Sequence, residues 1–240
     1  GFKVVHIEVP HPGTEQQSQW VKIRRLDPDW VILRGWGVMN PTALRTAAEV
    51  GYPRDRMIGA WFSGSEEDVV PAGDAAIGFI AAGFHPSGTG FKVHRDLQRY
   101  VYAEGLGNLS DATRLGTIYH NRGLIMAMIS VEGIRTAQQK FGQRTLSGEE
   151  IRWGFEHLAL DVTTLKKLGF EGLAQPLHVS CADHEGGGAV MFSRWDGKRW
   201  VQLTDWVEAD KALVRPMIEA SAARYADEHG LALRDCSAEE

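Results

Sequence analysis

The 240-residue sequence predicts an α/β protein with a doubly wound parallel sheet. Through residues 1–84, short apolar runs alternate with helical patterns, which is the order typical of such a sheet. The clearest part is residues 30–63, where two apolar runs flank a helix. That helix is expected to start at Asn40-Pro41, a good N-cap followed by a residue shaped for the first turn. Such a β-α-β unit joins two parallel strands through a right-handed crossover.

The other elements of the first half can be assigned in order. Residues 3–9 (KVVHIEV) are expected to form a short strand. Thr14 can cap a helix that runs to Leu26, with Trp20, Ile23 and Leu26 facing inward. The next elements are a strand from Trp30, a strand ending near Ala60, a helix near residues 66–70 and a strand from Ile77 to Phe84.

The second half begins at residues 85–90, a turn-rich stretch without periodicity. Helices are expected over roughly residues 91–102, from Tyr119 to Phe141, after the capping box of Ser147 and Glu150, and from Asp210 to His229. The expected inward face of the long helix consists of Leu124, Met128, Val131, Ile134 and Ala137. A strand at Leu177–Val179 precedes a hairpin that turns at Asp196-Gly197. This half has long apolar helices but few strands for them to cover.

Composition excludes several classes of function. With 43% hydrophobic and 24% charged residues, the chain has the composition of an ordinary globular protein. A net charge of −5 gives no electrostatic reason to expect nucleic acid as a partner. No apolar run approaches the roughly 18 residues that span a bilayer. The sequence contains no P-loop, no GxSxG and no GxGxxG after a strand, so the case for an enzyme is poor.

Two features near the C-terminal end leave alternatives open. Cys181 and Cys236 are either two unrelated buried thiols or one disulfide formed in an oxidising compartment, and composition does not choose between them. The segment from Asp183 to Gly186 resembles a metal site, but its polar residues are adjacent rather than four apart on a helix. A turn before the hairpin is the better interpretation, and no metal is expected.

Trp36 and Trp61 follow the two strands of the β-α-β unit, each beside glycine or small residues. Because parallel strands end at one edge of a sheet, where ligands of open α/β sheets bind, both are candidates for a binding cleft. The structural alternative is that these tryptophans belong to the core.

A set of short motifs runs along most of the chain in a fixed order. They are Gly13-Thr14 before Gln19, Asp27-Pro28-Asp29 before the strand at Trp30, Gly35-Trp36, Gly59, Gly73-Asp74-Ala75-Ala76 before Gly78, Tyr119, and Asp183-His184 before three glycines. In this order and spacing the chain resembles the branched-chain amino-acid (Leu/Ile/Val) family of type I periplasmic solute-binding proteins of ABC transporters. Such proteins hold a ligand between two α/β lobes.

The resemblance implies that the chain is an incomplete, C-terminal part of that fold, and upstream residues are expected in the natural protein. Four segments follow from it. Residues 1–84 would form most of lobe two, residues 85–90 a hinge crossing, residues 91–200 the returning part of lobe one, and residues 201–240 the last crossing and C-terminal helix. The sheet of lobe one would then be absent, which explains the uncovered helices.

The resemblance also implies which residues contact a ligand. Trp36 matches an aromatic residue that covers the ligand, whereas Trp61, followed by Phe62 and Ser63, stands where the family keeps an acid for an α-ammonium. An indole is suited to stacking on rings, so a small, mostly apolar carboxylate is favoured.

Other residues are candidates with open alternatives. Tyr119 heads the helix facing the hinge and His85 lies in it, and for each a purely structural role competes with ligand contact. Glu66 or Glu67 can replace the missing acid and so keep an amino-acid ligand open. Arg34 and Arg122 can pair with a carboxylate, although a solvated role is expected for both. These two arginines complete the set of candidates.

The implied function is that of the substrate-binding component of an ABC importer. Its ligand would be a small organic acid of the aromatic or branched-chain amino or keto acid type, captured in the periplasm without a cofactor. Its macromolecular partners would be the permease subunits in the inner membrane. The alternative is a ligand-sensing domain of a receptor or regulator with the same fold. A Rossmann-like enzyme is a third interpretation, for which the sequence offers least.

Overall fold

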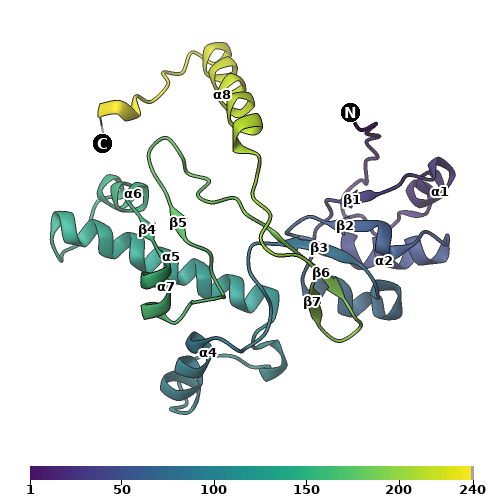
Figure 1. Cartoon of the computed structure of the whole chain (residues 1–240), viewed down its shortest axis with the longest axis horizontal. Helices are drawn as coiled ribbons and strands as arrows, with labels where there is room; N and C mark the ends of the chain where they lie inside the picture. Colours follow the sequence, from purple (N-terminus) through teal and green to yellow (C-terminus); the bar gives the residue numbers. More distant parts are fainter. Residues whose placement is uncertain (239–240) are drawn as a thin grey trace. The chain divides into compact units, whose positions relative to one another are not determined.

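A five-stranded sheet organises the first part of the computed structural model, which describes residues 1–238. Strands β1 (Val31–Leu33), β2 (Met57–Gly59) and β3 (Ile80–Gly83) are parallel neighbours. The antiparallel hairpin of β6 (Met191–Trp195) and β7 (Trp200–Gln202) adds to the free side of β3 (Figure 1). The predicted parallel β-α-β unit is confirmed, and the hairpin makes the sheet mixed.

Contacts between residues divide the chain into two compact units. Unit 1 comprises Gly1–Leu124 with Val190–Trp206, and unit 2 comprises Ile125–Ala189 with the segment from Val207 onward. The sequence analysis assigned most of the hairpin to the returning part of lobe one, but its pairing with β3 puts it in the sheet of unit 1. The assignment of the remaining ranges to ligand-binding lobes stays a prediction.

The core of unit 1 lies where its helices cover the sheet. These helices are α1 (Gln17–Leu26), α2 (Met39–Glu49) and α3 (Glu66–Val69), which continues as a 3-10 helix (Val70–Ala76). Unit 1 also contains α4 (Lys92–Leu97), which continues as a π-helix (Gln98–Tyr102) and contributes no residue to this core. Apolar side chains from α1, α2, the strands and the residue before β3 are fully buried together, among them Trp20, Leu44, Met57 and Phe79. The loops that follow β1, β2 and β3 therefore extend from a well-packed core.

Three expectations for the N-terminal segment are wrong. Residues 3–9 form no strand, and Val4 is 85% exposed, because no described strand pairs with this segment and an unpaired strand is not stable in water. Thr14 does not cap α1, which starts after Gln16, a buried side chain that donates to the Gly13 carbonyl oxygen at 2.8 Å. Leu26 is half-exposed because it lies at the end of α1.

Unit 2 is mainly helical. Its elements are α5 (Ile118–Phe141, beginning in unit 1), α6 (Gly148–Glu156), β4 (Ala159–Leu160), α7 (Val162–Leu168), β5 (Leu177–His178) and α8 (Lys211–Glu228). The capping box predicted for Ser147 and Glu150 is present at the start of α6. The C-terminal helix begins after Asp210, whose carboxylate accepts from the Leu213 N–H at 3.1 Å.

Helices α5 and α6 approach closely at Gly133 and Gly154. A side chain at Gly154 would collide with the Gly133 carbonyl oxygen and with Ala137. Of the predicted inward face of α5, Met128 and Ala137 are buried, but Val131 and Ile134 are 45% and 38% exposed. That part of the prediction is wrong for two reasons. Among the described residues, unit 2 has only the two-stranded β4–β5 sheet for α5 to pack on. The contact of α5 with α6 is made at the small residues Gly133 and Ala137 instead.

The hairpin turn is also longer than predicted. Trp195 pairs with Trp200, so four residues connect the strands rather than two. The Asp196 carboxylate accepts from the backbone N–H groups of Lys198 and Arg199, both at 2.8 Å, and this side chain stabilises the longer loop.

Candidate ligand-binding site

The carboxyl ends of β1, β2 and β3 lie along one edge of the sheet in unit 1, because these strands are parallel. Trp36, Trp61 and His85 each follow one of these strands within a few residues. The sequence-based expectation that these loops share an edge is therefore met by the topology. The side chains that converge there differ in part from those expected.

An arginine from α5 lies among the aromatic residues of this edge. The Arg122 guanidinium carbon is 4.7 Å from the centroid of the Trp61 ring and 5.2 Å from that of the Tyr119 ring. Its Nη2 donates to the Trp61 carbonyl oxygen at 3.0 Å. Trp61 also contacts the rings of Phe62 and Phe84, with centroids 5.2 and 5.9 Å away. We call Trp61, Phe62, Phe84, Tyr119 and Arg122 the aromatic–arginine cluster.

The positive charge of Arg122 has no carboxylate at ion-pair distance among residues 1–238. Burial lowers the pKa of Arg122, although a guanidinium remains protonated in proteins. A half-buried cation without a counter-ion, with ring faces beside it, is suited to an anion. The sequence suggested Arg122 as a possible carboxylate partner but favoured a solvated role. Its position three residues after Tyr119 on one helix is the signal that could have placed it beside that ring.

The carboxylates nearest in sequence to this cluster have protein partners. Glu66 accepts from the Ile118 N–H at 2.8 Å, at the N-terminus of α5, and burial raises its pKa. Glu67 forms an ion pair with Arg114 at 2.5 Å. Asp68 is buried, and its pKa is raised by burial despite hydrogen bonds from neighbouring groups.

Asn40 connects the first two loops of the edge. It lies inside α2 rather than at its N-cap, which corrects the sequence-based expectation. The side chain is fully buried, and its amide nitrogen donates to Asp68 Oδ1 at 2.7 Å and to the Phe62 carbonyl oxygen at 3.2 Å. A buried polar side chain needs such partners, and this one orients the backbone beside Trp61.

Ser63 lies under the edge rather than on its surface. It is fully buried, and its hydroxyl donates to the Gly35 carbonyl oxygen at 2.7 Å. This bond joins the loop after β2 to the loop after β1, which carries Trp36. Trp36 itself is 63% exposed and, within the described residues, has no ring contact with the aromatic–arginine cluster.

His85 is 5% exposed and is held by the turn that follows β3. Its Nδ1 lies 3.2 Å from the Pro86 carbonyl oxygen, and because a carbonyl only accepts, Nδ1 carries the proton. Burial lowers the pKa of His85, with a smaller contribution from the nearby Arg122, so the ring is neutral. Asn121 donates to the Pro86 carbonyl oxygen at 3.2 Å, which fastens this turn to α5.

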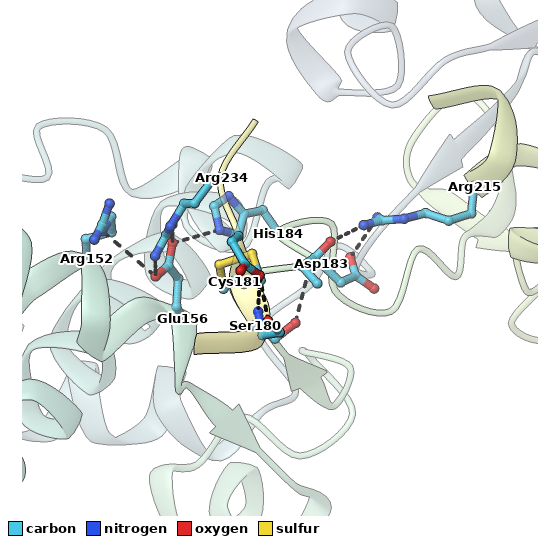
Figure 2. The surroundings of a disulfide bond; sticks show 12 residues. Arg152, Glu156, Ser180, Cys181, Asp183, His184, Arg215 and Arg234 are labelled. Carbon is cyan, nitrogen blue, oxygen red and sulfur yellow. Dashed lines mark hydrogen bonds and ion pairs between the residues drawn. A yellow bond between two sulfur atoms is a disulfide. The ribbon is translucent and has the colours of Figure 1, made fainter. Parts of the chain in front are cut away.

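Unit 2 contains a separate cluster around a disulfide. Cys181 and Cys236 are bonded, with Cα atoms 5.6 Å apart, which confirms the disulfide alternative (Figure 2). Nearby, the Glu156 side chain is 3% exposed and accepts two hydrogen bonds from Arg234, at 2.5 and 2.8 Å. His184 Nε2 lies 3.0 Å from the same carboxylate. These bonds lower the pKa of Glu156 to about 2, with Arg234 as the main cause.

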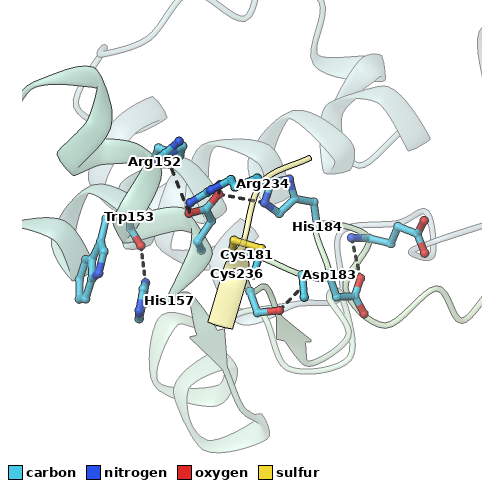
Figure 3. A network of polar contacts seen from close by, with 12 residues as sticks. Arg152, Trp153, His157, Cys181, Asp183, His184, Arg234 and Cys236 are labelled. Atoms are coloured by element: carbon cyan, nitrogen blue, oxygen red, sulfur yellow. Dashed lines mark hydrogen bonds and ion pairs between the residues drawn. A yellow bond between two sulfur atoms is a disulfide. The ribbon is translucent and has the colours of Figure 1, made fainter. Parts of the chain in front are cut away.

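The helix that carries Glu156 also brings other side chains to this cluster (Figure 3). Arg152 Nε lies 3.9 Å from the Glu156 carboxylate. The rings of Trp153 and His157 stack with centroids 3.8 Å apart, and His157 Nδ1 lies 2.8 Å from the Trp153 carbonyl oxygen. α6 thus supplies both the buried acid Glu156 and a second cation, Arg152, beside it.

The segment from Asp183 to Gly186 is a turn, and its acid binds basic residues of α8. Asp183 pairs with Lys211 at 3.0 Å and with Arg215 at 3.7 Å, and these hydrogen bonds and charges lower its pKa. In the part of the chain that the structure describes, no group of three His, Cys, Asp or Glu is placed to hold a metal ion. The turn fastens the C-terminal helix to unit 2.

The chain is similar to known proteins over most of its length. The family model for periplasmic binding proteins matches residues 1–199. A crystal structure described as an ABC transporter permease from the Pseudomonas fluorescens group is 48% identical, with a TM-score of 0.91, over 98% of this chain and 57% of that chain. A branched-chain amino-acid ABC transporter from Thermus thermophilus with bound valine is 19% identical, with a TM-score of 0.65, over 83% of this chain and 51% of that one.

A solute-binding protein from R. palustris in complex with benzoate is 16% identical, with a TM-score of 0.56, over 83% of this chain and 50% of that one. The chain thus spans about half the length of these structures. No curated protein matches it. None of the described helices combines the length and apolar character needed to cross a bilayer. The match over most of the sequence and the type I fold of the related structures show that this chain belongs to the periplasmic binding protein family.

Proposed function

We propose that this chain is part of the substrate-binding component of an ABC importer and captures a small organic acid between two lobes. The acid is of the aromatic or branched-chain amino or keto acid type. The observation that carries this proposal is Arg122, a half-buried cation without a carboxylate partner, beside the rings of Trp61 and Tyr119.

The chemistry of the aromatic–arginine cluster fits such a ligand. A guanidinium matches the two oxygens of a carboxylate, and its bond to the Trp61 carbonyl oxygen leaves Nη1 and Nε available. The ring faces of Trp61 and Tyr119, which are 41% and 37% exposed, offer apolar surface for the rest of the ligand. Trp36, on the loop after β1, extends this surface in the proposal, as a cover over the bound acid.

In this proposal the protein acts in the periplasm, and its partners are permease subunits of the inner membrane. Membership of the family supports this location, and the Cys181–Cys236 disulfide is consistent with an oxidising compartment. Related structures of the same fold carry valine, isoleucine, benzoate or 3,4-dihydroxybenzoic acid, so the fold itself accommodates both ligand types.

The test is a thermal-shift screen of the full-length protein against aliphatic and aromatic carboxylates, the matching amides, and amino acids. Carboxylates should raise the unfolding temperature, and amides should not. Arg122→Gln should abolish the shift. Arg99→Gln is the matched control, because Arg99 also lies over a tyrosine, Tyr100 at 5.1 Å, outside the cluster. Equal stabilisation of both variants by the carboxylate would refute the assignment of Arg122.

A further inference from the structure

We infer that this site selects carboxylates without an ammonium group, so that it binds a 2-oxo or aromatic acid in preference to the amino acid with the same side chain. This inference rests on the proposed function and specifies its ligand class. It is carried by the charges around Arg122, because an α-amino acid brings a positive charge to within a few ångströms of the carboxylate that Arg122 would hold.

The acid best placed to balance an ammonium is Glu66, and it is engaged in the fold. Its Oε2 accepts the backbone N–H of Ile118 at 2.8 Å, one turn before Arg122. An acid at this position also interacts favourably with the positive end of α5. Turning Glu66 toward a ligand would leave the helix terminus without its acceptor. The bond therefore positions Tyr119 and Arg122 and keeps the carboxylate away from the ligand.

The next two acids are engaged as well. Glu67 pairs with Arg114 at 2.5 Å, which connects α3 to the segment before α5. Asp68 is 1% exposed and receives the Ser65 hydroxyl at 2.7 Å, the Ser65 N–H at 2.9 Å and the Asn40 amide at 2.7 Å. Asp68 cannot reach an ammonium without breaking these contacts, and Glu67 Oε2, which has no hydrogen-bond partner among the described residues, is buried rather than exposed to a ligand.

The titratable group of the loop after β3, His85, supplies no negative charge to Arg122. His85 is neutral, with the proton on Nδ1, and its buried Nε2 offers at most an uncharged lone pair. Glu67 and Asp68 act on Arg122 electrostatically, but both already have protein partners, so an ammonium at this edge would meet the Arg122 cation without a carboxylate free to pair with it directly. At an effective dielectric constant near 20, two like charges about 5 Å apart disfavour binding by on the order of 100-fold.

The test compares matched ligands on the full-length protein by isothermal titration calorimetry. The pairs are phenylpyruvate against phenylalanine and 4-methyl-2-oxopentanoate against leucine, which differ at the 2-position. We expect the oxo acid of at least one pair to bind about 30-fold or more tightly than its amino acid. Binding of either amino acid as tightly as its oxo acid would overturn the inference while leaving a carboxylate site intact.

Two variants separate the possible failures. Glu67→Gln should leave the preference unchanged, because its carboxylate pairs with Arg114; a selective loss of amino-acid binding would show that Glu67 balances the ammonium, against the inference. Arg122→Gln should weaken the oxo acids by at least about 10-fold. If oxo acids bind this variant as they bind the parent, or if none of the four ligands binds the parent, the proposed function fails as well.

Discussion

Two arginines, one in each unit, are held in opposite ways. Arg234 of unit 2 donates two hydrogen bonds to Glu156, a carboxylate whose side chain is 3% exposed. Arg122 of unit 1 lies beside two rings and has no carboxylate at ion-pair distance among the described residues. The guanidinium of Arg234 thus stabilises the fold, whereas the guanidinium of Arg122 remains available to an anion.

The difference comes from the surroundings of each side chain. Glu156 is an acid that must have a partner because it is buried, and the disulfide beside it holds the tail that supplies Arg234. Around Arg122, the nearby acids Glu66 and Glu67 have other partners. Whether an arginine is structural or functional is therefore decided by the acids around it, and the following predictions test that comparison.

The largest effect is expected from removing the disulfide with Cys181→Ser and Cys236→Ser together. The two cysteines are 55 residues apart, and in the chain-entropy model such a crosslink contributes about 4 kcal/mol to the free energy of unfolding. Urea denaturation of the full-length protein measures this loss. A change below about 1 kcal/mol would show that the tail is held without the disulfide.

The next effect is expected for Arg234→Ala. Removing one partner of a buried ion pair costs about 3 kcal/mol of unfolding free energy, because the Glu156 carboxylate would keep only weaker partners. Arg224→Ala, on the exposed side of α8, is the control and should change stability by less than about 0.5 kcal/mol. Similar stability of both variants would contradict the structural role of Arg234.

Acid should weaken the same pair. The pKa of Glu156 is lowered from 4.5 to about 2 in the folded protein, so its contribution is complete above pH 4.5. It is lost as the pH falls from 4.5 to 2, because the unfolded chain then binds a proton that the folded protein does not. The contribution is at most about 3 kcal/mol. Glu156→Gln should remove this part of the pH dependence, as denaturation at several pH values would show.

The smallest effect is expected for Arg122→Gln without ligand. Because Arg122 has no ion-pair partner, its replacement should change the free energy of unfolding by less than about 1 kcal/mol, even though ligand binding is lost. Denaturation of the free protein checks this. A loss as large as that of Arg234→Ala would show that both arginines are structural and remove the contrast between them.

Local signals in the sequence predicted the elements that depend on nearby residues. The capping box of Ser147 and Glu150, the β-α-β unit and the C-terminal helix after Asp210 are all formed by contacts within a few turns. The segment at residues 3–9 has strand-like residues but no described partner strand. Pattern alone cannot reveal that absence, since strands require pairing.

The candidate site was predicted in part for the same reason. Trp61 and Tyr119 were proposed from the sequence because each stands at the end or start of an element. Arg122 was named as a possible carboxylate partner, but a solvated role was favoured, because its importance depends on Glu66 and Glu67 having other partners, which only the folded arrangement reveals. Ser63 was expected at the ligand and instead joins two loops, because its hydroxyl reaches the Gly35 carbonyl oxygen.

The pairing of β3 with β6 has a consequence for how the protein is synthesised. β3 ends at Gly83 and β6 begins at Met191, so β3 is translated long before its antiparallel partner leaves the ribosome. During that interval one side of β3 has unpaired backbone groups, which are prone to pair with other chains. A chaperone that holds the chain unfolded until β6 is available to pair with β3 should therefore raise the soluble yield.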